Sequence, residues 1–252
     1  RNNEEMYLAL GEMIYNLCNT HNKGTVVFFP SYTFLNKCNK LWVEHNILKK
    51  FENIKSVIMD NTKKKFFANI IKNEENKNFI FFSVCRGTSS EGVDFKDDDA
   101  RMIICVGIPY SNINEDRIKY KMEYLNEHRQ SSNGIKPGSI WYEADAMINV
   151  NQALGRVIRH SKDYGIMICI DSRYEKLLKK KLFSEWIVRD AKIITSCNIL
   201  GYFDILGNFL SENSTRFDSN IINSDNEENI KTDNIANNKT IYKNDNNSSN
   251  TF

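Results

Sequence analysis

The sequence predicts an α/β domain built on a mainly parallel sheet, with helices on both faces of the sheet. Short apolar runs rich in β-branched and aromatic residues alternate with longer helix-like stretches, and this alternation is typical of parallel βα units. The apolar runs contain no alternating polar residues, as expected for strands that are buried on both faces. With 252 residues, of which 41% are apolar, the chain can form a sizeable core.

Five runs are expected to be strands and six stretches are expected to be helices. The strands are expected at residues 25–29, 56–59, 79–85, 102–106 and 166–170. The helices are expected at residues 5–19, 31–48, 62–73, 114–129, 141–160 and 172–180. Ligand sites in such sheets collect at the carboxyl ends of the strands, so the informative residues should follow the apolar runs.

The chain is expected to divide into a folded domain, residues 1–210, and a disordered tail, residues 211–252. The tail contains 12 asparagines, with seven acidic residues against four basic ones. It has almost no apolar periodicity and cannot bury enough surface to offset its chain entropy. Residues 1–210 then carry a net charge of +5, which permits an anionic partner without demonstrating one.

Several classes of protein are not expected. No apolar run reaches the roughly 18 residues of a membrane span, and the first residues do not resemble a signal peptide. The six cysteines are scattered without a C-x-x-C pair, so we expect buried reduced thiols and no metal site. His21, His45 and His128 are expected at the surface or at helix ends. Because the chain begins with Arg1 and not with Met, we expect it to be a fragment of a longer polypeptide.

The first segment with candidate chemistry is Phe28–Tyr32, which follows the first strand. Pro30 ends the strand because it cannot donate to the sheet, and Ser31 is well placed as a helix N-cap. A phosphate could bind at such a helix start, with the Ser31 and Tyr32 hydroxyls as further donors. Simple capping is the alternative.

The second segment is Cys85–Phe95, which follows the most apolar run. Positions 86–94 contain two glycines, three hydroxyl residues, one arginine and two acids. Glycines let the backbone approach a ligand, and exposed N–H groups and hydroxyls can surround phosphate oxygens. The segment is not a P-loop, because the chain contains no G-x-x-x-x-G-K-[ST]. An ordinary βα turn is the alternative.

The third segment is Asn149–His160. On a continuous helix Gln152, Arg156 and Arg159 lie along one face, with Gly155 beside them. Two guanidinium groups on one stripe, with no acid between them, repel each other unless an anion joins them. Phosphate is the natural anion for this stripe, and a solvated basic face is the alternative.

With these segments the chain resembles the second motor domain of the XPD-type iron–sulfur DNA helicases of superfamily 2. The three segments are similar to motif IV (FFPSY), motif V (RGK-x-SEG-x-DF) and motif VI (Q-x-x-GR-x-x-R) of that family, in order and spacing. Within the family, the chain resembles the branch of the regulator of telomere elongation helicase and the Fanconi anaemia group J helicase. Thr88 departs from the pattern, because the family usually has lysine there, and a hydroxyl is a weaker phosphate ligand.

The resemblance implies a RecA-like domain without its own P-loop and with defined roles for the motif residues. ATP and Mg²⁺ are shared with an N-terminal motor domain of the same polypeptide, which also carries the 4Fe-4S cluster. The residues implied at the phosphates as catalytic groups are Arg159, Arg156 and Gln152. Those implied at the nucleotide are Gly92, Asp94 and Gly155. Those implied to hold single-stranded DNA are Ser31, Tyr32, Arg86, Gly87, Thr88 and Ser89.

The same resemblance implies an ATP-dependent helicase that moves 5′ to 3′ on forked or structured DNA, in DNA repair or telomere maintenance in the nucleus. The isolated chain is expected to be inactive, because the family's P-loop and acidic metal-binding motif are not in it. Two alternatives remain open. One is a nucleic-acid-binding module that has lost motor activity, and the other is an unrelated α/β enzyme such as a nucleotide-sugar transferase. The second alternative requires that the Arg86–Asp94 loop lie far from the arginine-bearing helix.

Overall fold

The computed structural model describes residues 4–60, 78–87, 95, 99–130, 134–158, 160, 163–189, 191–194 and 201–216. The chain divides into two compact units, Arg1–Leu210 and Ser211–Phe252. The expected helix at residues 62–73 lies outside the described residues. The architecture below is that of the first unit.

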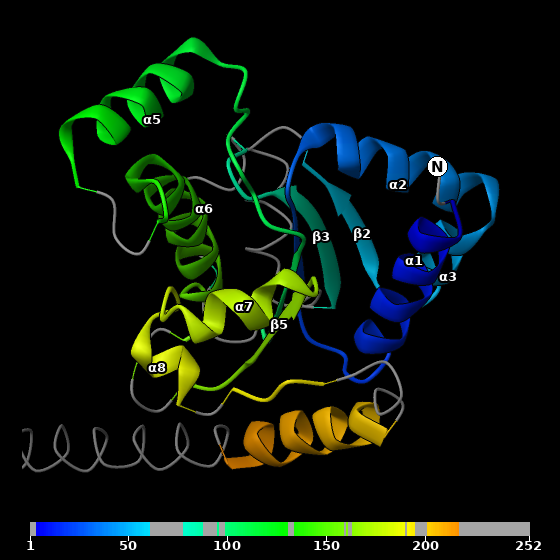
Figure 1. Cartoon of the computed structure of the whole chain (residues 1–252). Helices are drawn as coiled ribbons and strands as arrows, with labels where there is room; N and C mark the ends of the chain where they lie inside the picture. Colours follow the sequence, from blue (N-terminus) through cyan, green and yellow to red (C-terminus); the bar gives the residue numbers. More distant parts are fainter. Residues whose placement is uncertain are drawn as a thin grey trace, which may run out of the picture. The chain divides into compact units, whose positions relative to one another are not determined.

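The predicted parallel sheet is confirmed, and its five strands lie in the order β2-β3-β1-β4-β5 (Figure 1). Every pair of neighbouring strands is parallel. The strands are β1 (Thr25–Phe29), β2 (Ser56–Met59), β3 (Phe79–Val84), β4 (Met102–Val106) and β5 (Ile166–Ile170). Four of them match the expected ranges, and β3 ends one residue early. The central strands β1, β3 and β4 are fully buried, as their uninterrupted apolar sequences predict.

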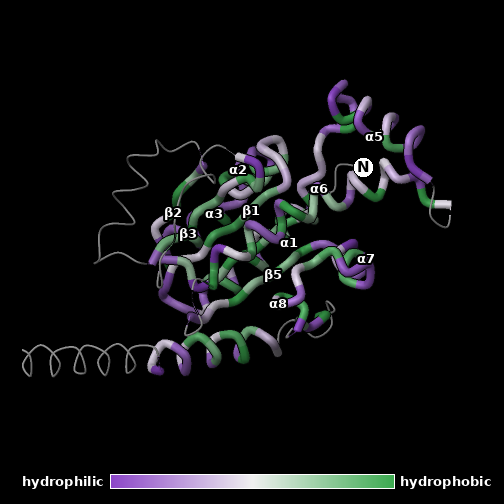
Figure 2. The backbone as a smooth tube through the Cα atoms, turned by 90° about the vertical axis from the view of Figure 1, so that its left-hand side faces the viewer, coloured by the Kyte–Doolittle hydropathy of each residue, from purple (hydrophilic) through white to green (hydrophobic). Residues whose placement is uncertain are grey.

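The helices lie on both faces of the sheet, as expected. Their bounds are α1 (Glu4–Cys18), α2 (Tyr32–Glu44), α3 (Ile47–Glu52), α5 (Asp116–His128), α6 (Pro137–Leu154), α7 (Arg173–Lys179) and α8 (Glu185–Val188). Figure 1 shows α1, α2 and α3 on one side of the sheet and α6 and α7 on the other. In Figure 2 the strands are largely hydrophobic, whereas α5 carries long hydrophilic stretches.

Alternate side chains of each strand supply the two halves of the core. On the face that meets α1–α3, Phe29 and Phe82 pack with Trp42 and Phe51, with ring centroids 5.3–6.1 Å apart. On the opposite face, Phe28 and Ile103 belong to a buried cluster that also contains residues of α6 and α7. The two halves fix the sheet between helices, so the strand ends are held in a defined arrangement.

Two expected helices have different bounds in the structure. The helix expected at 31–48 is divided into α2 and α3 by Asn46, which has a left-handed backbone with φ of 59°. The helix expected at 141–160 begins at Pro137 and ends at Leu154. Pro137 fits the first helical position, and Gly155, a poor helix former, stands at the C-cap.

Residues 201–216 are helical, and the expectation of a disordered tail from residue 211 stays a prediction. The rest of the tail lies outside the described residues. Among the described cysteines, all of which are free thiols, Cys18, Cys38 and Cys105 are buried, as expected, whereas Cys85 and Cys169 are only partly buried. His45 caps α2, as expected, whereas His21 is partly buried. Within the described part of the chain, no helix has the length and apolar character to cross a lipid bilayer.

Candidate functional site

The predicted site residues that are described lie on the segments that follow the strands and at the end of α6. The parallel strands bring the segments after β1, β2, β3, β4 and β5 to one edge of the sheet. We call this edge, formed by residues 30–32, 60, 85–87, 107–111 and 171–173, the carboxyl edge. Thr88, Ser89, Gly92, Asp94 and Arg159 lie outside the described residues, so their predicted roles stay predictions.

Ser31 is the N-cap of α2, as predicted. Its backbone is extended, with φ of −161° and ψ of 158°, and its hydroxyl accepts a hydrogen bond from the Phe34 amide at 3.2 Å. Tyr32, the first residue of α2, is 45% exposed. Ser31 therefore caps the helix, as the capping alternative predicts. The ring of the neighbouring Tyr32 is accessible to a ligand.

Gly87 brings the first and second segments together. A side-chain carbon at this position would lie 2.7 Å from the Tyr32 hydroxyl, 2.7 Å from Asp60 Oδ2 and 3.1 Å from the Val84 carbonyl oxygen. Such distances are too short for a carbon, so glycine is required for this close approach. The loop after β3 thus lies directly against the start of α2.

Asp60 is a residue of the carboxyl edge that the sequence analysis did not single out. It follows β2 and is 5% exposed. Its Oδ2 accepts hydrogen bonds from the Ser83 hydroxyl and the Val84 amide, each at 3.1 Å. Its position directly after an apolar run could have identified it, because the other candidate segments were found by their position after a predicted strand.

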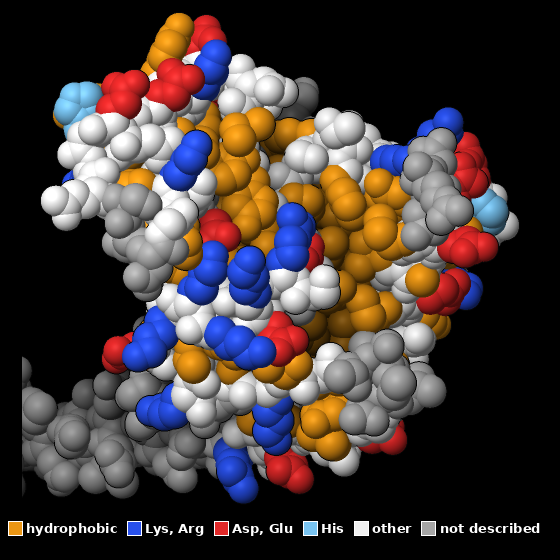
Figure 3. Space-filling model, in the orientation of Figure 1, with side chains coloured by type: hydrophobic (Ala, Val, Ile, Leu, Met, Phe, Trp, Pro, Cys, Tyr) orange, Lys and Arg blue, Asp and Glu red, His pale blue; other side chains and the backbone are white. Residues whose placement is uncertain are grey.

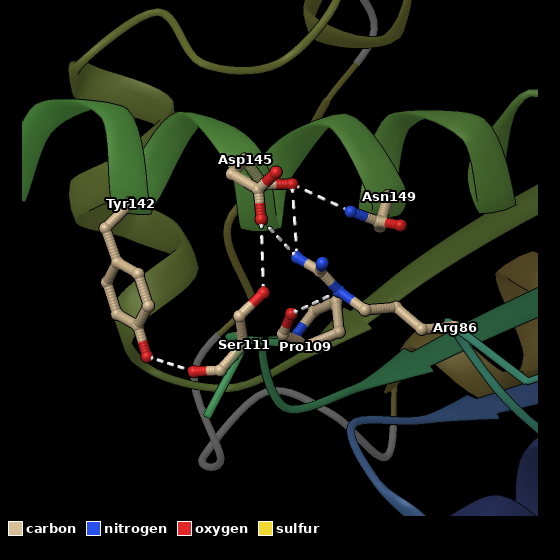
Figure 4. A network of polar contacts seen from close by, with 6 residues as sticks. All are labelled: Arg86, Pro109, Ser111, Tyr142, Asp145 and Asn149. Atoms are coloured by element: carbon tan, nitrogen blue, oxygen red, sulfur yellow. Dashed lines mark hydrogen bonds and ion pairs between the residues drawn. The ribbon is translucent and has the colours of Figure 1, made fainter. Parts of the chain in front are cut away.

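Arg86 connects the loop after β3 to α6 and to the loop after β4 (Figure 4). Its Nη2 lies 2.7 Å from Asp145 Oδ2, and its Nε donates to the Pro109 carbonyl oxygen at 3.1 Å. The Ser111 hydroxyl lies 3.3 Å from the same Asp145 oxygen. The guanidinium group is therefore paired inside the domain. The family resemblance instead implies a contact between Arg86 and a DNA phosphate.

The loop after β4 is held by several further contacts. Gly107 has a left-handed backbone with φ of +62°, its amide donates to the Ile170 carbonyl, and its own carbonyl accepts from the Tyr174 hydroxyl at 2.6 Å. The Tyr110 and Tyr142 rings stack with centroids 5.1 Å apart. Burial raises the pKa of both tyrosines above its ordinary value. This loop and α6 thus form one packed unit.

The third segment spans the C-terminal end of α6 and the turn that follows it. Gln152 is exposed on the last turn of the helix, whereas Arg156 is partly buried and lies in the turn after it. The prediction that Gln152 and Arg156 lie on one continuous helix is therefore wrong, because the helix ends at Leu154. Asn151 fixes this end, since its amide donates to the Leu182 carbonyl at 2.9 Å and accepts from the Ser184 amide at 3.0 Å.

The chemistry of these groups suits a phosphate better than a metal ion. Gln152 and Arg156 supply hydrogen-bond donors, and Figure 3 shows Lys and Arg side chains gathered over α6 and α7 beside an apolar area. Across the described residues, no group of three or more His, Cys, Asp or Glu is arranged to hold a metal ion. Gly155 lies beside this end of α6, where a side-chain carbon would be 3.2 Å from the Asn151 carbonyl oxygen and 4.0 Å from the Trp186 ring.

Relatives of the chain are known. A protein described as a regulator of telomere elongation helicase 1 homolog from Aedes aegypti is 37% identical over 194 residues, which cover 74% of this chain and 19% of the relative. Its counterpart from Culex quinquefasciatus is 37% identical over 195 residues, covering 74% of this chain and 20% of the relative. The chain therefore spans about a fifth of the length of these relatives.

Two solved structures share the fold. One, described as XPD_Helicase, is 19% identical with a TM-score of 0.56, and the alignment covers 77% of this chain and 32% of that one. Another, described as XPD_APO, is 18% identical with a TM-score of 0.53, covering 77% and 37%. The sequence model of the family described as helicase C-terminal domain matches residues 14–190. Because this match includes all three predicted segments, the chain belongs to the helicase C-terminal domain family.

Proposed function

We propose that this chain is the C-terminal motor domain of an ATP-dependent, 5′ to 3′ DNA helicase that acts in DNA repair or telomere maintenance in the nucleus. The observation that carries the proposal is the meeting of three segments on one side of the domain. The Gly87 backbone lies against Tyr32, and the neighbouring Arg86 is bonded to α6, the helix that leads to Gln152 and Arg156. The alternative of a nucleotide-sugar transferase requires the loop that begins at Arg86 to lie far from α6, and the bond between Arg86 and α6 argues against it.

In this proposal an N-terminal motor domain of the same polypeptide supplies the P-loop, the Mg²⁺ ligands and the 4Fe-4S cluster. ATP hydrolysis supplies the free energy for movement. Arg156 and Arg159 stabilise the charge that develops on the transferred phosphoryl group, and Gln152 positions the attacking water. Gly92, Asp94 and Gly155 lie next to the nucleotide.

The carboxyl edge holds single-stranded or forked DNA in this proposal. Ser31, Tyr32, Gly87, Thr88 and Ser89 supply hydroxyl and backbone N–H donors to phosphates, which hold a strand without reading its sequence. The exposed Tyr32 ring can also stack on a base. Closing and opening of the cleft between the two motor domains then moves the strand across this edge.

The experiment that tests the proposal is Arg159→Ala in the full-length protein. We expect ATPase kcat to fall by roughly 10³-fold, with single-stranded DNA affinity nearly intact, because the arginine acts on the transition state. Lys50→Ala is the control, since this exposed lysine pairs with Glu12 of α1 and is not part of the carboxyl edge. Unchanged turnover in Arg159→Ala would overturn the assigned role. A wild-type protein that binds DNA but never hydrolyses ATP would instead support the binding-module alternative.

A further inference from the structure

The guanidinium of Arg86 is bonded to other residues of the chain, unlike that of an arginine whose donors all face a ligand. Two of its three guanidinium nitrogens are used within the chain, Nη2 by Asp145 and Nε by the Pro109 carbonyl oxygen. The side chains of Arg86 and Asp145 are only 34% and 28% exposed. In a partly buried arginine–carboxylate pair the carboxylate fixes the orientation of the guanidinium and neutralises much of its positive charge. Arg86 is therefore a poor candidate for a DNA phosphate ligand.

Asp145 lies on the same stripe of α6 as Gln152. The spacing of Asp145, Asn149 and Gln152 is i, i+4 and i+7, which places the three on one face of the helix. Asn149 continues the contact along this face, because its amide donates to the Asp145 carbonyl oxygen at 2.7 Å. Seven residues correspond to about 10 Å along a helix axis. A displacement of α6 at Asp145 is therefore carried to Gln152 by a rigid element.

The second contact of Arg86 makes the connection stiffer. Pro109 and Ser111 belong to the loop after β4, and Ser111 is bonded to α6 twice, once through Asp145 and once through the Tyr142 hydroxyl. Tyr142 also stacks on Tyr110 of the same loop. The guanidinium of Arg86 thus joins three elements that are remote in sequence: the loop after β3, the loop after β4 and α6 (Figure 4).

From these contacts we infer that Arg86 is a positioning residue, which couples the DNA-holding loop after β3 to the phosphate-directed end of α6 through Asp145. DNA that moves the Arg86–Gly87 backbone then moves α6, and with it Gln152 and Arg156. This inference rests on the proposed function, and it deepens it by naming the side-chain pair through which DNA regulates ATP turnover. Lysine would not replace Arg86, because a single ammonium cannot reach Asp145 and Pro109 in the same fixed geometry.

The test uses Asp145→Asn in the full-length protein, because asparagine keeps the shape of the side chain and removes its charge. We expect the ratio of DNA-stimulated to basal ATPase turnover to fall about tenfold. The dissociation constant for single-stranded DNA and its salt dependence should stay unchanged. Arg86→Gln should lower the same ratio, and the double variant should be no worse than the more severe single variant, because both remove one link.

Glu143→Gln is the matched control. Glu143 lies on the same helix, but its carboxylate pairs with Lys180 and not with Arg86, so the ratio should not change. A direct phosphate contact predicts the opposite pattern, in which Arg86→Gln reduces the salt slope of DNA binding by about one and Asp145→Asn leaves the ATPase ratio intact. Strictly additive effects of the two single variants would also overturn the inference.

Hydrogen exchange separates a failure of this inference from a failure of the proposed function. A wild-type protein whose ATPase does not respond to DNA would contradict the proposed function. In the same protein, the α6 amides around Asp145 should exchange about tenfold faster in Asp145→Asn than in wild type or Glu143→Gln, since the link restrains that helix. Unchanged exchange rates would overturn the link itself.

Discussion

The two edges of the sheet use polar residues in opposite ways. We call the residues before the strands, 21–24, 55, 78, 99–101 and 163–165, the amino edge. There, charged side chains are buried and bonded to partners inside the domain. At the carboxyl edge Asp60 is also buried, but Arg86 is partly exposed and Tyr32 is 45% exposed.

Lys55 illustrates the amino edge. It is 4% exposed, and its ammonium donates to the carbonyl oxygens of His21 and Lys23 at 3.0 and 2.6 Å and to Asn78 Oδ1 at 2.7 Å. Burial lowers its pKa to about 8. The three acceptors come from the segments that precede β1 and β3, so this side chain fixes the starts of two strands.

Arg101 has the same role between β4 and β5. Its guanidinium has no exposed surface and forms an ion pair with the equally buried Asp163. It also donates to the Tyr164 carbonyl oxygen at 2.8 Å, and it lies 4.0 Å from the centroid of the Tyr164 ring. The comparison teaches that the fully buried charges of the amino edge fix the starts of the strands, whereas the carboxyl edge also presents exposed groups such as the Tyr32 ring.

The largest effect on stability is expected at Arg101. Arg101→Met leaves the Asp163 carboxylate buried without its ion-pair partner, so the free energy of unfolding should fall by about 3–5 kcal/mol. Urea denaturation followed by circular dichroism measures this change. Replacing Asp163 as well, in Arg101→Met with Asp163→Leu, should recover part of the loss. If the free energy of unfolding of Arg101→Met were within about 1 kcal/mol of the wild-type value, the proposed contrast between the two edges would be wrong.

The next effect is a pH dependence at His21. Burial lowers its pKa to about 3, and the nearby Lys55 ammonium adds to the shift. Since the unfolded chain takes up a proton near pH 6.5 and the folded chain does not, stability present above that pH is lost on acidification. The loss should approach 1.4 kcal/mol, roughly, for each pH unit below about 6.5. His21→Gln should flatten this slope in urea denaturation, and an equally steep slope in the variant would contradict the assignment.

The smallest effect is expected at Ser31 on the carboxyl edge. Ser31→Ala removes the hydrogen bond to the Phe34 amide and should lower the free energy of unfolding by about 1 kcal/mol. Ser31→Asp preserves a good N-cap but introduces a negative charge where DNA phosphates are proposed to lie. It should therefore retain stability while weakening single-stranded DNA binding in the full-length protein. Equal DNA affinity in wild type and Ser31→Asp would place the strand elsewhere.

The sequence predicted the strand positions well because each is a short apolar run, although only the central strands β1, β3 and β4 are fully buried, and the edge strands β2 and β5 are partly exposed. The ranges 25–29, 102–106 and 166–170 match β1, β4 and β5. Helix ends were predicted less well. Neither the left-handed Asn46 nor the end of α6 at Leu154 follows from apolar periodicity, because both depend on local backbone choices that several residues permit.

The sequence by itself determined the fold class, the three segments and their family, because these depend on local composition and short motifs. Only the tertiary structure decided the partners of the charged residues. Arg86 and Asp145 are 59 positions apart, and Arg101 and Asp163 are 62 apart. Their pairing follows from the strand order β2-β3-β1-β4-β5 and from the packing of α6 on the sheet. No local pattern encodes such contacts, since the same arginine on an open loop would meet water and not a buried carboxylate.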